Sequence, residues 1–269
     1  MDSPARPQAP LLSVIVPLYN EAATVLPTLG RLLAVPVPKQ VIVVDDGSTD
    51  GSGDLVRDFA SEHPEVEVLS HETNRGKGAA IKSAIPHLRG RYTIIQDADL
   101  EYDPREFPKL LEAARQHGAR VVYGSRILGG RLISYRRYYW GGRLVSLVAS
   151  ILYGQRISDE STCYKLFETS LLRALPLGEE RFGFCAEATA LVRRLGHRIL
   201  EVPIAYNPRS MEEGKKIRWI DGLRALWVLL KYRFARVRPK APSAAATPSR
   251  LDGSGREGQA QWPRKGTGN

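Results

Sequence analysis

A pair of carboxylates one residue apart is the clearest chemical signal in this chain. Asp97 and Asp99 follow the short apolar run 92–96, and Glu101 stands two residues further on. Two carboxylates at this spacing can face one divalent ion, and their hard oxygen ligands suit Mg²⁺ or Mn²⁺. Such an ion neutralises a diphosphate leaving group. The run therefore predicts a metal site with ligands Asp97 and Asp99, and with Glu101 completing the shell.

Two further polar clusters also follow short apolar runs. One is Pro-Leu-Tyr-Asn-Glu at 17–21, and the other is Val-Asp-Asp-Gly-Ser-Thr-Asp at 44–50. An acidic pair that closes a single strand is often only a turn or a helix cap. Ligands of doubly wound sheets, however, bind beyond the carboxyl ends of the strands. Three polar clusters at one such edge predict a binding site.

The glycine-rich run Asn-Arg-Gly-Lys-Gly at 74–78 is too short for either common phosphate-binding loop pattern. We interpret it as the start of a helix. Its lysine, Lys77, is open to two interpretations, either a contact to a phosphate near the helix N-terminus or a solvated side chain.

Apolar, β-branched runs alternate with segments of helical spacing, which predicts an α/β fold with a doubly wound sheet. The expected strands are 11–17, 41–45, 66–69, 92–96, 120–123 and 198–203. The expected helices are 22–33, 78–88, 107–115, 138–153, 184–195 and 217–234. One domain, 11–238, carries the fold. The polar segments 1–10 and 239–269 are expected to be disordered, and the first of them resembles no secretory signal.

The charge of the chain is concentrated in two segments. The 269 residues carry a formal charge of +10, of which 124–156 contributes +6 and 206–240 contributes +7, so the remainder is −3. Basic patches either bind polyanions or form a solvated surface. Nucleic acid is excluded as the partner, because no nucleic-acid-binding motif is present and the acidic strand ends would repel it. Two cysteines exclude a disulfide scaffold and a cysteine-rich zinc module.

These runs, in this order, resemble family 2 glycosyltransferases of the GT-A fold. The resemblance rests on 13–21, 43–50, 74–78 and 96–100. Later runs are similar to the polyprenol-phosphate branch, which includes dolichyl-phosphate mannose and glucose synthases. Those runs are 124–126, 159–165, 202–203 and 213–216. The resemblance implies a Rossmann-like three-layer α/β/α fold with a mostly parallel central sheet.

The resemblance also implies an activity. A hexose, mannose or glucose, would pass with inversion from a GDP or UDP sugar to a polyprenyl phosphate, with Mg²⁺ or Mn²⁺ as cofactor. A phosphate monoester is already anionic near neutral pH, so it needs positioning by arginines more than a general base. The alternative is a saccharide hydroxyl acceptor in cell-surface polysaccharide assembly, in which case Glu187 would be the base.

Site residues follow from the resemblance by position. The nucleotide sugar would contact Pro17, Tyr19, Glu21, Val44, Asp46, Asp97, Ala98, Asp99, Arg209 and Lys215. The acceptor phosphate would contact Arg126, Arg136 and Arg137, and the catalytic group would be Asp99, Arg126 and Arg137. The run 159–165 either shapes the acceptor side or is a strand start with a buried Cys163.

A lipid acceptor requires contact with a membrane. The longest nearly apolar run, 144–153, is too short to span a bilayer. The amphipathic segment 136–153 and the helix 217–234 could each lie on an anionic membrane surface, or the helix could pack on the core of its own domain. We expect a cytoplasmic protein, peripheral at the cytoplasmic face of the membrane.

Overall fold

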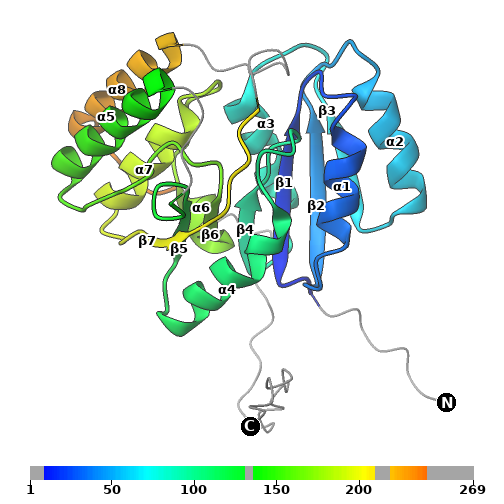
Figure 1. Ribbon diagram of the computed structural model, residues 1–269, viewed down its shortest axis with the longest axis horizontal. Coiled ribbons are helices and arrows are strands. Elements are labelled where there is room, and N and C mark those ends of the chain that lie inside the picture. The colour runs from blue at the N-terminus through cyan, green and yellow to red at the C-terminus, as the bar shows by residue number, and fades with distance from the viewer. Residues whose placement is uncertain (1–8, 131–135, 210–218, 241–269) are drawn as a thin grey trace, which may run out of the picture.

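A central sheet with the strand order β3-β2-β1-β4-β6-β5-β7 organises the chain (Figure 1). The computed structural model describes residues 9–130, 136–209 and 219–240. The strands are β1 (Leu12–Leu18), β2 (Lys39–Asp45), β3 (Val66–Ser70), β4 (Tyr92–Ile95), β5 (Val121–Ser125), β6 (Lys165–Glu168) and β7 (Leu200–Pro203). Strand β6 runs antiparallel to both its neighbours, and the other pairs are parallel. The predicted mostly parallel sheet is confirmed.

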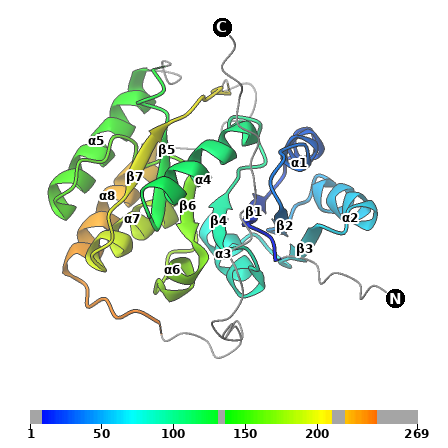
Figure 2. The same ribbon diagram turned by 90° about the horizontal axis from the view of Figure 1, so that it is seen from below.

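Helices cover both faces of this sheet. They are α1 (Val25–Leu33), α2 (Ser52–Glu62), α3 (Lys77–Ala84), α4 (Phe107–Gln116), α5 (Arg136–Tyr153), α6 (Thr169–Ala174), α7 (Phe184–Arg194) and α8 (Trp219–Phe234), with short 3₁₀ turns η1 (Ile85–His87) and η2 (Pro104–Glu106). Figure 2 shows α1 and α4 on one side of the sheet and α3 and α6 on the other. The predicted three-layer α/β/α arrangement is therefore present.

Burial of the central strands explains their sequences. In β1 and β2 nearly all residues are buried, because a parallel sheet covered on both faces has no polar side. The sequence gives no alternation of apolar and polar residues there, and the strands are marked instead by continuous runs of Val, Ile and Leu. Their carboxyl ends, at Leu18 and Asp45, lie side by side in the ladder.

The sequence prediction missed helices α2 and α6, and it gave strand β6 only as one interpretation of the run 159–165. A strand does start at Lys165, and Cys163 is buried. Helix α2 has few apolar residues and buries only a narrow stripe around Val56, so its helical period is faint. Strand β6 and helix α6 are short and adjoin directly, which hides the change from one period to the other. The expected helix 78–88 changes to the 3₁₀ turn η1 because Pro86 cannot continue the α-helical hydrogen bonding. Of the segments expected to be disordered, 1–8 and 241–269 lie outside the described residues.

The glycine-rich run before α3 serves close packing. Gly76 has a φ of +100°, and a Cβ on Gly78 would lie 2.5 Å from the Glu179 carbonyl oxygen. The segment 177–181 thus lies directly on the first turn of α3, where Ala79 N–H donates to the Glu180 carbonyl at 2.8 Å. These glycines admit a neighbouring backbone segment, and they hold Lys77 between them.

We predict that Gly78→Ala destabilises the protein by about 1–3 kcal/mol, because the added methyl must displace backbone in a packed contact. Gly30→Ala is the matched control, since Gly30 lies in α1 with nothing within 4 Å of the added Cβ. That change should stabilise by about 0.5–1 kcal/mol through backbone entropy. Urea unfolding measures both, and equal effects of the two substitutions would contradict the packing argument.

Candidate active site

The three polar strand ends meet at one edge of the sheet, as predicted. The guanidinium of Arg209 joins two of them, because its Nη2 lies 3.0 Å from Glu21 Oε1 and 3.2 Å from Asp99 Oδ2. The third is joined by Asn20 N–H, which donates to Ser48 Oγ at 3.0 Å. Glu21 follows β1 and Asp99 follows β4, and these two strands are paired in the sheet. Leu100 has a φ of +61°, which is uncommon for a side chain with a Cβ. The backbone thus turns sharply just after Asp99.

Asp97 is paired with a lysine. Lys77 Nζ lies 2.5 Å from Asp97 Oδ1 and 3.6 Å from Cys163 Sγ. Burial lowers the pKa of Lys77, but the Asp97 carboxylate outweighs this and the pKa is raised overall. Lys77 is therefore a cation at this edge. It is paired with Asp97 and only 18% exposed, so it is not the solvated side chain of the second interpretation. The sequence signal for its position is the pair of flanking glycines.

Asp99 lies among like charges. Burial is the largest cause that raises its pKa, the charges of Asp97 and Glu101 follow, and Arg209 opposes them. The pKa of Asp99 rises to about 7 as a result. The cluster thus carries more negative charge than its two cations balance comfortably, and it would bind a further cation favourably.

Glu101 holds a segment of chain in place. Its carboxylate accepts from the Tyr206 hydroxyl at 2.6 Å and from the backbone N–H of Arg209 at 2.9 Å. Its backbone carbonyl accepts from the backbone N–H of Asn207 at 2.9 Å. Through these bonds Glu101 fixes the segment after β7 across the end of β4, which brings Arg209 to the site.

Two of the three predicted metal ligands fit a divalent ion. The side chains of Asp97 and Asp99 are 24% and 17% exposed, whereas Glu101 is buried and both its oxygens accept hydrogen bonds. Within the described residues no group of three or more His, Cys, Asp or Glu side chains is arranged to hold a metal. Mg²⁺ usually binds one or two carboxylates together with water and substrate phosphates. Asp97 and Asp99 meet this need, and the role of Glu101 as a third ligand stays a prediction.

Two predicted nucleoside contacts have other surroundings. Val44 is fully buried in β2. The Asp46 carboxylate accepts from the N–H groups of Arg75 and Gly76 at 3.0 and 2.7 Å, and it lies 2.6 Å from His71 Nδ1. Asp46 thereby fixes the glycine-rich run, and the nucleoside contacts of Val44 and Asp46 stay predictions.

The remaining donor contacts stay predictions. Pro17 is half-buried near the end of β1, Tyr19 is 37% exposed beyond it, and Ala98 is buried between the two aspartates with its carbonyl accepting from the Thr28 hydroxyl. Lys215 lies outside the described residues.

Arg126 is held by a carboxylate. Its Nε and Nη2 each donate to Asp159 at 2.8 Å, and its backbone N–H donates to the same carboxylate at 2.9 Å. Its guanidinium also lies 5.0 Å from the centre of the Tyr206 ring. The side chains of Arg126 and Asp159 are both nearly buried. The predicted phosphate contact would require Arg126 to share or leave this partner. Arg136 and Arg137 open α5, but their side chains are not described.

Glu187, the base in the alternative function, is buried in α7 and faces the segment 177–181. Its carboxylate accepts from Gly178 N–H at 2.6 Å, from Glu179 N–H at 3.0 Å and from the Tyr232 hydroxyl. Burial raises its pKa. With three donors and no exposed surface, Glu187 joins α7, α8 and the segment 177–181, and it lacks access to a hydroxyl substrate.

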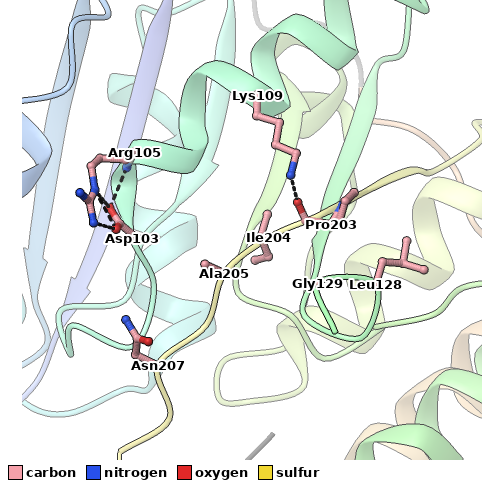
Figure 3. A pocket seen from close by; sticks show the side chains of 9 residues that line it. All are labelled: Asp103, Arg105, Lys109, Leu128, Gly129, Pro203, Ile204, Ala205 and Asn207. Carbon is pink, nitrogen blue, oxygen red and sulfur yellow. Dashed lines mark hydrogen bonds and ion pairs between the residues drawn. The ribbon is translucent and has the colours of Figure 1, made fainter. Parts of the chain in front are cut away.

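A groove lies beside the site, beneath the segment after β7 (Figure 3). In it Lys109 of α4 donates to the carbonyl of Pro203, and Asp103 pairs with Arg105. None of the residues predicted for donor, metal or acceptor lines it. The nine lining residues are Asp103, Arg105, Lys109, Leu128, Gly129, Pro203, Ile204, Ala205 and Asn207.

Helices α5 and α8 lie side by side (Figure 1) and share an exposed apolar face. The opposite side of α8 packs on the core through Val228 and Leu229. Of the described helices, none combines the length and hydropathy that a bilayer crossing requires. We call the exposed face the apolar platform. Its members are Trp140, Leu144, Leu147, Ile151, Ile220, Leu223, Trp227, Leu230 and Phe234, which are 43–80% exposed.

Comparisons with known proteins agree with this geometry. Residues 13–175 match the sequence pattern of the family described as glycosyl transferase family 2. An undecaprenyl-phosphate mannosyltransferase of Micrococcus luteus is 35% identical over 242 residues, which cover 81% of this chain and 97% of the relative. A polyprenol monophosphomannose synthase of Mycolicibacterium smegmatis is 30% identical, over 75% of this chain and 79% of the relative.

The fold is that of solved glycosyltransferase structures. Glucosyl-3-phosphoglycerate synthase from Mycobacterium tuberculosis, solved with Mn²⁺, UDP-glucose and phosphoglyceric acid, superposes with a TM-score of 0.63 at 22% identity, covering 83% of this chain and 80% of that one. The sheet with its carboxylates after β4 thus defines a GT-A type glycosyltransferase fold. The chain belongs to glycosyl transferase family 2, and its resemblance to the polyprenol-phosphate branch is confirmed.

We predict that Asp159→Asn destabilises the protein by about 3–5 kcal/mol, because Arg126 would keep a buried charge without a counter-ion. Glu112→Gln is the matched control. Glu112 pairs with Arg115 on the surface of α4, and both are well exposed. Its loss should cost less than about 1 kcal/mol. Urea unfolding at neutral pH compares them, and a similar small effect at both positions would contradict this assignment.

The effect of Asp159→Asn should depend on pH. Burial opposes the charge of Asp159, but Arg126 outweighs it and holds the pKa of Asp159 below its usual range. The contribution of this carboxylate is then complete at neutral pH and is lost as the pH falls through the lowered pKa. The difference in unfolding free energy between wild type and variant should narrow at acid pH.

Proposed function

We propose that this protein transfers a hexose, mannose or glucose, from a GDP or UDP sugar to a polyprenyl phosphate, with inversion. The observation that supports this most is the carboxylate pair Asp97 and Asp99 beside two cations, Lys77 and Arg209, at the carboxyl edge of the sheet. This arrangement suits a diphosphate donor held with a divalent ion. The relative that is 35% identical is named for transfer to undecaprenyl phosphate.

The reaction needs little acid–base chemistry. An oxygen of the acceptor phosphate attacks the anomeric carbon from the face opposite the leaving group. The bond between that carbon and the donor's β-phosphate oxygen breaks, and the nucleoside diphosphate leaves with the electron pair. The acceptor is already anionic, since its second pKa is about 6. The burial of Glu187 agrees with this reaction and disfavours a saccharide hydroxyl acceptor.

Each charged group has a task in this proposal. Asp97 and Asp99 hold Mg²⁺ or Mn²⁺, which when bound offsets the charge of the leaving diphosphate. We assign Arg209 and Lys215 to the donor phosphates, and Pro17, Tyr19, Glu21 and Ala98 to the nucleoside. Arg136 and Arg137 are assigned to the acceptor phosphate. Arg126 would reach a phosphate only by sharing or leaving Asp159, which already binds its guanidinium.

The apolar platform would bring the enzyme to its lipid substrate. Its side chains are exposed in the described chain, and basic residues 233, 236, 238 and 240 follow at the end of α8, all exposed. Such a surface fits an anionic bilayer: the apolar side chains enter the interface, and each basic residue adds about 1 kcal/mol. We propose that the protein is peripheral at the cytoplasmic face, where nucleotide sugars would reach it.

The proposed transfer is tested with a panel of nucleotide sugars, including GDP-mannose and UDP-glucose, and a polyprenyl phosphate. We predict that Asp99→Asn lowers the transfer rate at least about a hundredfold, since a ligand that offsets the leaving-group charge is lost. EDTA should abolish transfer, and Mg²⁺ or Mn²⁺ should restore it. Asp58→Asn, on the exposed side of α2, is the charge-matched control and should leave transfer unchanged.

Three outcomes would contradict parts of this proposal. Full transfer in EDTA would rule out the metal, and full transfer by Asp99→Asn would overturn the placement of the donor. Transfer to a saccharide hydroxyl but not to a polyprenyl phosphate would replace the function by the alternative.

Membrane docking is tested by flotation with anionic and neutral liposomes. Replacing Ile151 and Trp227 together by Gln should lower binding to anionic vesicles at least about tenfold, because two large side chains no longer enter the interface. Leu11→Gln is the control, since Leu11 is an exposed leucine at the start of β1. Equal flotation of the double variant and wild type would exclude the platform as the docking surface.

A further inference from the structure

Lys77 is one of the two cations at the proposed donor site but has not yet been given a task of its own, and it lies on one of the two carboxylates assigned to the metal. Its Nζ is 2.5 Å from Asp97 Oδ1, and the two side chains are only 18% and 24% exposed. Arg209 makes the corresponding contact on Asp99 at 3.2 Å. Each carboxylate of the predicted metal site therefore has a cation of the protein beside it.

We propose that Lys77 is an exchangeable counter-ion: it neutralises Asp97 in the metal-free protein, yields that carboxylate to the divalent ion, and then binds the diphosphate of the donor. This inference rests on the proposed function, because it concerns the same site. It adds a positioning residue for the donor and a reason why the metal and the nucleotide should bind together.

The backbone around Lys77 is fixed, whereas its ammonium group can move. Gly76 N–H donates to Asp46, and a Cβ on Gly78 would lie 2.5 Å from the Glu179 carbonyl. Both neighbours of Lys77 are thus held against other parts of the chain. The side chain beyond is a flexible four-carbon stem, so Nζ can shift by a few ångströms without moving α3.

Charge balance supports this exchange. A divalent ion on Asp97 and Asp99 would bring two positive charges next to an ammonium group already within hydrogen-bond distance of Asp97. Like charges so close repel strongly in a partly buried site. The donor diphosphate supplies the negative charge that the displaced ammonium needs. Metal alone should therefore compete with Lys77, and metal with nucleotide should not.

The test uses Mn²⁺ alone as the first probe. Free Mn²⁺ is measured by electron paramagnetic resonance during titration of wild type, Lys77→Met and Lys77→Arg. Lys77→Met should bind Mn²⁺ about tenfold more tightly than wild type, because no ammonium has to leave Asp97. Lys77→Arg keeps the charge and should stay close to wild type. Urea unfolding verifies that each variant is folded.

Lys82→Met is the matched control. Lys82 lies in the same helix and donates to the Gly178 carbonyl at 3.0 Å, and it pairs loosely with Glu180. Its removal takes one positive charge from α3 without touching Asp97. Mn²⁺ affinity should be unchanged in this variant. This result would separate direct competition for Asp97 from the long-range effect of removing one positive charge from α3.

The second probe is UDP or GDP at saturating Mn²⁺. Lys77→Met should bind the nucleoside diphosphate about tenfold more weakly than wild type, and the matching nucleoside monophosphate equally well. Unchanged or weaker Mn²⁺ binding by Lys77→Met, or no Mn²⁺ binding by any variant, would overturn the exchange. Unchanged diphosphate binding by Lys77→Met would overturn the claim that the displaced Lys77 binds the diphosphate of the donor. Neither titration contains a polyprenyl phosphate. The titrations therefore test the role of Lys77 independently of whether the protein transfers a sugar to that acceptor.

Discussion

Repulsion between carboxylates at one edge of the sheet is the constraint on which the site depends. Asp97, Asp99 and Glu101 follow the same strand, and Glu21 approaches from the neighbouring one. Such a cluster persists only with counter-charges supplied by other elements. The chain supplies them from distant segments, and Arg209 lies across two strand ends at once. In the proposed function, binding of a metal and an anionic donor would replace these internal ion pairs by contacts to the bound groups.

Much of the architecture could be predicted from the sequence because it rests on local patterns. Continuous β-branched runs mark β1 and β2, whose residues are buried on both faces. Polar clusters directly after such runs point to the ligand-binding edge, since parallel strands end together. Helix α2 was missed because its buried stripe is narrow. Strand β6 stayed one of two interpretations because four residues are too few to show a period.

Partner choice within the site could not be predicted. Arg126 and Asp159 are 33 residues apart, and nothing in either local sequence indicates that they pair. Glu101 has the residue type and spacing of a metal ligand, but its surroundings make it the anchor of the segment after β7. Residue type limits what a side chain can do. Which of those possibilities is realised depends on contacts between distant segments, and only the three-dimensional structure shows them.

The link between α3, the segment 177–181 and α8 affects where the domain ends. The family pattern stops at residue 175. Beyond it, Glu180 accepts a hydrogen bond from α3, and Glu187 joins Tyr232 of α8 to the same segment. A fragment cut at the end of the family pattern would thus uncover the first turn of α3 and remove β7 from the sheet. The stretch that identifies the family is shorter than the packed unit that contains it.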